Sequence, residues 1–164
     1  MGATIHTRVG QGEDVHRLEA GRPLLVGCVV IDSPCGAVGH SDGDVLAHAV
    51  CDAIFGALAA GDIGSHFPPS EERWRGADSR IFLTHAARLL RSKGGRVVNL
   101  DATVTLEAPR LAPYMGEIRR TLGRLLGCPE SAVSVKAKTA EGLGAIGGGE
   151  AIAARAVVLV ELER

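Results

Sequence analysis

The chain has 164 residues, of which 46% are hydrophobic and only 3% aromatic, and its formal charge is −1. This length predicts a single domain over residues 1–164, with a core built from Ala, Val, Leu and Ile. The near-neutral charge argues against a nucleic-acid-binding protein, which would carry a broad basic surface. We see neither a membrane-crossing segment nor a secretory signal, and the four cysteines form no C-x-x-C pair. We therefore expect reduced thiols and a cytoplasmic protein with no membrane partner.

Residue patterns predict strands and helices in turn along the chain. In chain order we expect a strand over 8–14, a strand or hairpin arm over 23–31, a turn at 33–36, a helix over 44–60, a surface loop over 65–76, a helix over 78–93, a strand over 99–106, a helix over 113–126, and strands over 133–138 and 153–162. Ser41 and Asp42 are candidate N-caps of the first helix, and Gly61 is its candidate C-terminal end. Together these elements predict an α+β fold, a two-layer sandwich in which helices cover one face of a mixed β-sheet.

The clearest chemical signal is a D-x-H pair, Asp14 and His16, on an extended segment where residues two apart point to the same face. His48 is the best candidate for a third ligand. Zinc accepts carboxylate oxygen and imidazole nitrogen, and three protein ligands leave an open position for a substrate oxygen. Asp44 and Asp52 lie one helical turn to either side of His48, so either could orient its ring. The alternative is a surface carboxylate beside an unrelated histidine.

A second polar cluster, residues 40–44, lies at the expected start of the first helix. Ser41 and Asp42 suit the capping of free backbone N–H groups. Capping does not require His40, whose imidazole could donate to a phosphate oxygen. His66 and His85 have no cluster of polar or metal-ligating residues beside them in the sequence, and we expect His85 to be a surface or half-buried helix residue.

Thr139 and Glu141 follow the expected strand over 133–138, and residues 142–147 spell G-x-G-x-x-G. A dinucleotide-binding motif is excluded, because a strand rather than a helix is expected after these glycines. Their backbone amides could still bind an anion, and Glu141 is a hard oxygen ligand suited to Mg²⁺ shared with phosphates. A flexible turn with a solvated glutamate remains the alternative.

Six motifs in order resemble those of the 2-C-methyl-D-erythritol 2,4-cyclodiphosphate synthase family. They are the segments 8–16, 40–48, 61–64, 67–68, 76–79 and 136–141. The resemblance implies a step of non-mevalonate isoprenoid biosynthesis. In this step 4-diphosphocytidyl-2-C-methyl-D-erythritol 2-phosphate cyclises to 2-C-methyl-D-erythritol 2,4-cyclodiphosphate and releases CMP. It also implies a homotrimeric lyase with its sites between subunits.

The same resemblance assigns roles to individual residues. It implies that Asp14, His16 and His48 bind Zn²⁺, that Glu141 binds Mg²⁺ or Mn²⁺, and that His40 and Thr139 stabilise the transition state. The implied substrate-binding residues are Ser41, Asp62, Gly64, Phe67, Pro68, Glu71, Leu106, Ala108, Pro109, Arg110, Leu111, Ala112 and Lys138. The chain departs from the family pattern at Pro69, Ala145 and Gly148.

Two other functions remain open from the residues alone. A zinc-dependent phosphohydrolase acting on a small phosphorylated metabolite would use the same Asp14, His16 and His48 to activate water. A non-catalytic nucleotide- or metal-binding module would need neither His40 nor Thr139. The products formed from the diphosphocytidyl substrate would separate these three functions.

Overall fold

A computed structural model describes residues 4–163, and its centre is a five-stranded mixed sheet with strand order β4-β1-β7-β5-β6. The strands are β1 (Ile5–Ala20), β4 (Cys35–Ala37), β5 (Gly95–Thr105), β6 (Val133–Lys138) and β7 (Ala151–Glu163). Only β5 and β6 run parallel; every other neighbouring pair is antiparallel. Two short strands, β2 (Leu24–Val26) and β3 (Val29–Ile31), form a separate hairpin.

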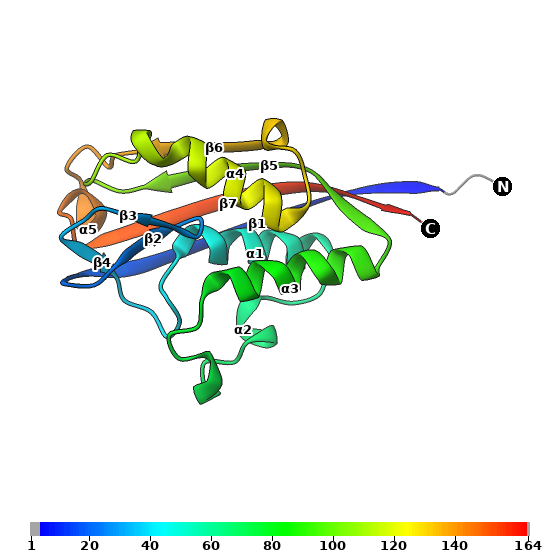
Figure 1. Cartoon of the computed structure of the whole chain (residues 1–164), viewed down its shortest axis with the longest axis horizontal. Helices are drawn as coiled ribbons and strands as arrows, with labels where there is room; N and C mark the ends of the chain where they lie inside the picture. The colour runs from blue at the N-terminus through cyan, green and yellow to red at the C-terminus, as the bar shows by residue number, and fades with distance from the viewer. Residues whose placement is uncertain (1–3, 164) are drawn as a thin grey trace.

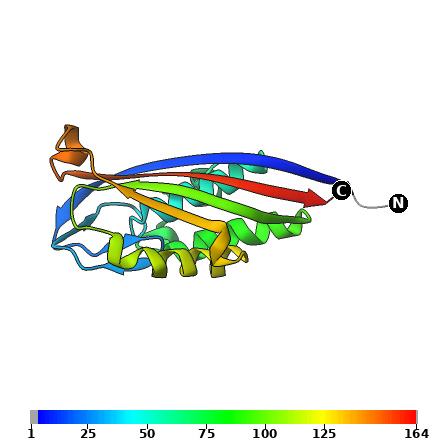
Figure 2. The ribbon, with the colours of Figure 1, turned by 90° about the horizontal axis from the view of Figure 1, so that it is seen from above.

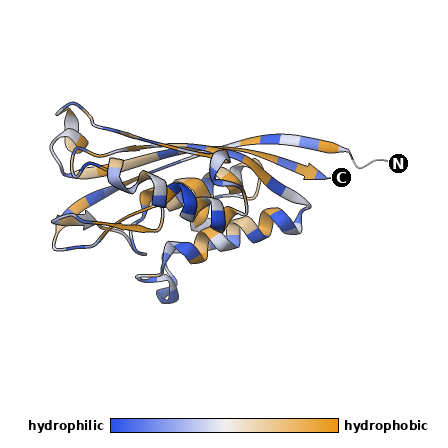
Figure 3. Cartoon of the chain, turned by 45° about the horizontal axis from the view of Figure 1, so that its top comes forward, coloured by the Kyte–Doolittle hydropathy of each residue, from blue (hydrophilic) through white to orange (hydrophobic). Residues whose placement is uncertain are grey.

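The longer helices lie on one face of this sheet, which Figure 2 shows nearly edge-on. The helices are α1 (Val45–Ala57), α2 (Ile63–His66), α3 (Ser79–Ser92), α4 (Met115–Leu126) and α5 (Gly144–Gly147). Helix α1 packs directly on β1 and β7, and α3 packs beside α1 (Figure 1). Hydrophilic and hydrophobic residues both recur along α3, as expected for a helix with one solvent-facing side (Figure 3). The predicted α+β class, with a mixed sheet and covering helices, is confirmed.

Most expected elements are present, with shifted ends. Strand β6 has the predicted bounds, and α3 and α4 begin within two residues of the prediction. The segment 23–31 is a hairpin, one of the two forms expected. Strand β5 begins four residues earlier than residue 99. The predicted surface loop contains the end of α2 and a 3-10 turn at Glu72–Trp74. Within residues 4–163, no helix is long and apolar enough to cross a membrane.

Two glycines of β1 let α1 approach the sheet closely. A Cβ atom on Gly10 would lie 1.8 Å from the carbonyl oxygen of Ala53, and one on Gly12 would lie 2.1 Å from that of Ala49. Both alanines are fully buried, so small residues meet across the contact on the helix side too. The low aromatic content agrees with this packing, because the space between helix and sheet has no room for large side chains here. The backbone of α1 lies against the backbone of β1.

The N-terminus of α1 is capped differently from the prediction. Neither Ser41 nor Asp42 caps the helix. Asp44 is the N-cap, and its side chain accepts a hydrogen bond from the Ala47 N–H. The same carboxylate accepts from Gly27 N–H at 2.9 Å and from Cys28 N–H at 2.5 Å, so it joins the helix to the β2–β3 hairpin. The two extra donors explain why Asp44 occupies this position.

The C-terminal end also differs, because α1 stops at Ala57 and Leu58 is its C-cap. Gly61 therefore does not close the helix, although it does adopt a positive φ of 84°. Ala59 takes a left-handed conformation first, with φ of 51°. The chain consequently turns two residues before Gly61 and leads into α2.

We expect Asp44→Asn to destabilise the fold by about 3 kcal/mol, because an amide has one acceptor oxygen for three buried N–H donors. Its NH₂ group would also face donors instead of accepting from them. Urea unfolding of the variant beside the wild type measures the loss. Asp78→Asn is the matched control, since Asp78 caps α3 at an exposed position. Equal losses in the two variants would contradict the special role of Asp44.

Candidate active site

Three side chains that could hold a metal ion, Asp14, His16 and His48, converge where β1 lies against α1, and together they are called the metal-ligating cluster. Asp14 Oδ2 lies 2.9 Å from His16 Nε2 and 2.9 Å from His48 Nδ1. Strand alternation places Asp14 and His16 on the helix-facing side of β1, and α1 supplies His48. One potential ligand atom from each residue lies within 4.8 Å of the others. The arrangement fits a single cation held by one oxygen and two nitrogens.

The proton positions on the two imidazoles fit a metal site. His16 Nδ1 lies 2.6 Å from the carbonyl oxygen of Val38. A carbonyl only accepts, so this nitrogen carries the hydrogen, and Nε2 of the neutral ring has a free lone pair directed at the cluster. A ligating histidine commonly donates through its other nitrogen in this way.

His48 is held in the complementary manner by Ser79 and Asp42. Ser79 Oγ donates to the Asp42 carboxylate and lies 3.1 Å from His48 Nε2. Because the hydroxyl hydrogen is committed to Asp42, the serine oxygen accepts from Nε2–H, and Nδ1 presents its lone pair beside Asp14. Ser41 Oγ also lies 3.1 Å from Nε2.

The suggestion that Asp44 or Asp52 orients His48 is therefore wrong. Asp44 faces the hairpin amides, as described above. Asp52 instead accepts a 2.7 Å hydrogen bond from the Ile63 N–H, at the start of α2. Burial raises the pKa of the Asp52 carboxyl.

Electrostatics in the cluster favour a charged carboxylate. Burial acts to raise the pKa of Asp14, but hydrogen bonds and charge from His16 and His48 outweigh it and lower the pKa to about 2. The hydrogen bond to Asp14 raises the pKa of His16, against the opposing effect of burial. A proton on His16 thus competes with a cation for the same lone pair, so acidification weakens metal binding.

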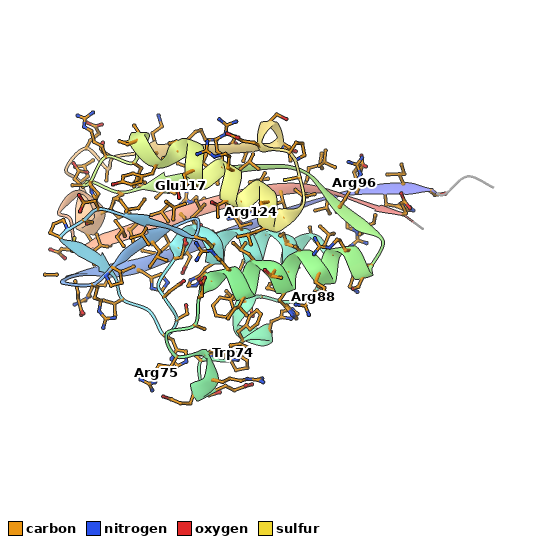
Figure 4. All side chains as sticks on the ribbon, viewed as in Figure 1. Trp74, Arg75, Arg88, Arg96, Glu117 and Arg124 are labelled. Atoms are coloured by element: carbon orange, nitrogen blue, oxygen red, sulfur yellow. The ribbon has the colours of Figure 1, made fainter. Side chains whose placement is uncertain are left out.

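The cluster opens into a cleft of about 230 Å³ between α1, α3 and the loop after α2. Its lining combines the metal-ligating cluster with polar and apolar residues. The other lining residues are His40, Ser41, Asp52, Ile63, Gly64, Phe67, Pro69, Trp74 and Phe82. Phe67, Trp74 and Phe82 pack against one another, with ring centroids 4.5 to 6.0 Å apart. Figure 4 places Trp74 in the loop that projects beyond α3. One side of the cleft is therefore apolar, and the other carries the side chains that could hold a cation.

The predicted residues around this cleft occupy different positions. His40 is half-buried, with Nε2 3.5 Å from the carbonyl oxygen of Glu71. Asp62 is the N-cap of α2 and accepts from both the backbone and the hydroxyl of Ser65. Pro68 is half-buried beside the lining residues Phe67 and Pro69. The Glu71 carboxylate pairs with Arg73.

The second predicted group lies at the end of the sheet formed by β5 and β6. Thr139 Oγ1 donates to Glu141 Oε1 at 3.0 Å, and both side chains are exposed, as is Lys138. Among the described residues, none from 106–112 or 138–141 lines the cleft with the metal-ligating cluster. The two predicted halves of the site thus do not meet in one cleft of this chain.

Burial distinguishes the residues of segment 106–112. Leu106 and Leu111 are buried core residues, and their side chains pack inside this chain. Ala108, Arg110 and Ala112 are exposed, and Pro109 is half-exposed. Ligand contacts in this segment would therefore come from these four residues or from the backbone.

Sequence reasoning assigned no role to Ser79 and treated Asp42 only as a cap. Their hydrogen bond to each other joins residues 37 positions apart. The sequence indicates only that Ser79 follows Asp78, the N-cap of α3. The structure adds that Ser79 is fully buried although it is polar. Buried polar groups are nearly always hydrogen-bonded, which marks Ser79 once its burial is known.

Comparison with known proteins places this geometry in context. The model of the YgbB family matches residues 7–161. The chain belongs to the YgbB family. The resemblance inferred from six motifs is therefore confirmed over nearly the whole chain. Relatives in this family are named 2-C-methyl-D-erythritol 2,4-cyclodiphosphate synthase, which also confirms the predicted enzyme class.

Relatives and solved structures agree with the family assignment. The synthase of Xylella fastidiosa is 51% identical over 156 residues, covering 95% of this chain and 89% of that protein. The synthase of Geobacillus kaustophilus is 53% identical over 154 residues, covering 94% and 98%. A CDP-bound synthase structure has a TM-score of 0.86 at 42% identity, covering 93% of this chain and 99% of that chain. IspF of Plasmodium falciparum, a CDP complex, has a TM-score of 0.85 at 34% identity and covers 96% and 97%.

Proposed function

We propose that this protein converts 4-diphosphocytidyl-2-C-methyl-D-erythritol 2-phosphate to 2-C-methyl-D-erythritol 2,4-cyclodiphosphate and CMP. The observation that carries the proposal is the cluster of Asp14, His16 and His48 in a cleft that also contains His40 and Ser41. The names of the family members support the same reaction. They do not favour the phosphohydrolase alternative. The predicted cytoplasmic location and the single domain over residues 1–164 stay predictions.

In this function Asp14, His16 and His48 hold Zn²⁺, and Glu141 holds Mg²⁺ or Mn²⁺. The donor sets suit these ions, because zinc accepts nitrogen and oxygen while Mg²⁺ prefers hard carboxylate oxygen. Divalent ions reduce the repulsion between two phosphate groups that must approach each other and help to hold them in line. No nucleophile from the protein is needed, since an oxygen of the 2-phosphate attacks the β-phosphorus and CMP leaves with the electrons of the broken P–O bond.

The chain's own residues bind and orient the reacting groups. His40 and Ser41 line the cleft beside the cluster and supply hydrogen-bond donors for phosphate oxygens. Thr139, whose hydroxyl contacts Glu141, can turn its hydrogen toward a phosphate once the carboxylate is bound to a cation. Phe67 and Trp74 exclude water from the apolar side, where the methylerythritol carbon chain fits.

We further propose a homotrimer whose sites form between neighbouring subunits. Val9, Val15 and Val157 are exposed on the sheet face opposite the helices, and a second cleft of about 650 Å³ opens there. Exposed apolar patches of this kind indicate protein contacts. Asp14 lines this second cleft as well as the first. The separation of the 138–141 segment from the metal-ligating cluster within one chain supports a shared site.

Product analysis tests the reaction directly. The purified protein is incubated with the diphosphocytidyl substrate and Mg²⁺, and the products are separated and identified by ³¹P NMR. We expect equal amounts of CMP and the cyclic diphosphate. Inorganic phosphate without cyclic product would favour a phosphohydrolase, and the absence of any turnover would favour a binding module.

We expect Glu141→Gln to retain zinc but to lose most of its turnover, because an amide oxygen lacks the charge that attracts a hard cation. Rates measured across a Mg²⁺ titration test this. Glu150→Gln is the matched control, since Glu150 is an exposed carboxylate beyond the same glycine loop. Undiminished activity of Glu141→Gln at limiting Mg²⁺ would contradict the assignment.

We expect inactive His48→Ala and inactive Glu141→Gln chains to regain activity when they are unfolded and reassembled together. With random mixing in equal amounts, roughly a quarter of the sites in a cyclic trimer would combine an intact cluster with an intact Glu141. If both halves came from one chain, every site would keep a lesion. No recovered turnover, despite subunit exchange shown by mass spectrometry, would contradict the shared site.

A further inference from the structure

A second pair of histidines lies outside the metal-ligating cluster, between α2 and α3. The His66 ring stacks on Phe55 of α1, with centroids 4.0 Å apart and an interplanar angle of 12°. Its Nε2 lies 2.8 Å from the carbonyl oxygen of Ala60, and its Nδ1 lies 3.3 Å from Nε2 of His85. Three separate segments therefore hold this one ring.

These contacts determine where the protons of the neutral pair lie. The carbonyl of Ala60 only accepts, so Nε2 of His66 carries the hydrogen and Nδ1 is an acceptor. His85 must then donate from its own Nε2. Both rings are Nε2–H tautomers, and the hydrogen bond runs from α3 to the last residue of α2.

The pair supports one wall of the cleft. His66 ends the turn whose residues Ile63 and Gly64 line the cleft, and Phe67 follows immediately. The Phe67 N–H donates to the Ile63 carbonyl, and the Phe67 ring meets the His85 ring nearly edge-on at 5.1 Å. His85 itself is not among the residues that line the cleft. His85 therefore contacts the wall residues on the side that faces away from the cleft.

We propose that His85 is a positioning residue for ligand binding: its hydrogen bond to His66 holds the α2 turn and Phe67 in the conformation that forms the cleft wall. The identity of the ligand rests on the proposed function. The positioning effect itself concerns any ligand that contacts Ile63, Gly64 or Phe67 in the cleft.

Charged and apolar groups both surround the pair of histidines. Asp62 at the start of α2 acts on His66, Arg88 on α3 acts on His85, and the face of Phe55 toward His66 is apolar. Figure 4 shows Arg88 on α3. Burial lowers the pKa of His85, and His66 and Arg88 lower it further. The neutral form of His85 is therefore favoured.

The test compares His85→Leu, which removes the donor, with His85→Gln, whose side-chain amide can replace Nε2–H. KM for the diphosphocytidyl substrate, kcat and the Kd of CDP are measured for each. We expect His85→Leu to raise KM and Kd about fivefold, the effect of one net hydrogen bond, with kcat little changed. His85→Gln should restore most of the affinity.

Other outcomes are equally decisive. Wild-type affinity in His85→Leu, or equal losses in both variants, would overturn the positioning role. If His85→Leu does not fold, ¹⁵N NMR of the wild-type imidazoles at pH 8 remains a test, and an Nδ1–H tautomer of either ring would refute the hydrogen bond. A wild-type protein without turnover, whose CDP affinity still separates Leu from Gln, would overturn the proposed function and support the positioning role.

Discussion

Replacing His48 with alanine is expected to remove the bound zinc and to lower turnover by roughly a thousandfold or more, while the chain stays folded. The large effect follows from the loss of one of three ligands, because a metal ion supplies several kcal/mol of charge stabilisation at a phosphoryl transition state. The fold survives because α1 keeps its contact with the sheet through Ala49 and Ala53, which are fully buried. Metal analysis, CMP release and thermal unfolding measure the three parts of this prediction.

A matched control is His6→Ala, because His6 is an exposed histidine on the same strand as two of the proposed ligands. It should keep zinc, turnover and melting temperature. His48→Cys provides a second comparison, since a thiolate also binds zinc. One zinc per chain in His48→Ala would remove His48 from the ligand set, and an unfolded variant would show that its buried contacts with Ser41 and Ser79 matter more for the fold.

A single methyl group on Gly12 should impair both stability and metal binding. In Gly12→Ala the new Cβ would lie 2.1 Å from the Ala49 carbonyl oxygen, so α1 must move away from β1. We expect a loss of about 3 kcal/mol, at the upper end for overpacking, because backbone rather than a flexible side chain obstructs the group. The shift separates His48 from Asp14 and His16, and zinc affinity should fall at least roughly tenfold.

Gly56→Ala is the control for this substitution. Gly56 lies on α1 itself, and a Cβ there would meet only the Gln11 carbonyl oxygen at 3.7 Å. Alanine favours a helix over glycine, so the control should be as stable as the wild type or more stable. Urea unfolding and competitive zinc titration of the two variants give the comparison. Wild-type zinc affinity in Gly12→Ala would show that the close contact does not position His48.

The metal-ligating cluster could be proposed from sequence because it depends on two short-range regularities. Asp14 and His16 share a strand face by the two-residue period, and His48 belongs to a strongly apolar helix that had to pack on the sheet. The helix cap could not be deduced in the same way. Ser41, Asp42 and Asp44 are all good caps locally, and the choice is made by the Gly27 and Cys28 amides, 17 and 16 residues away from Asp44.

Long-range polar contacts account for the rest of what the sequence does not reveal. Ser79 meets Asp42 and His48 because α3 begins beside α1, and His66 meets His85 because α2 turns back over Phe55. Neither contact leaves a periodic signal. The burial of Leu106 and Leu111 is likewise not visible in the family pattern, because a motif identifies a segment but not which of its residues face inward.

The close contact of β1 with α1 also determines which strand register is possible. The face of β1 toward α1 presents Gly10, Gly12, Asp14 and His16 in that order, two residues without side chains and then two proposed ligands. A slip of two residues would place Asp14 beneath Ala49, where not even a Cβ fits, and a slip of one would turn both ligands to the opposite face. The close contact between β1 and α1 therefore excludes a shifted pairing of β1 with β7. When α1 packs on β1 in this way, Asp14, His16 and His48 are brought together as well.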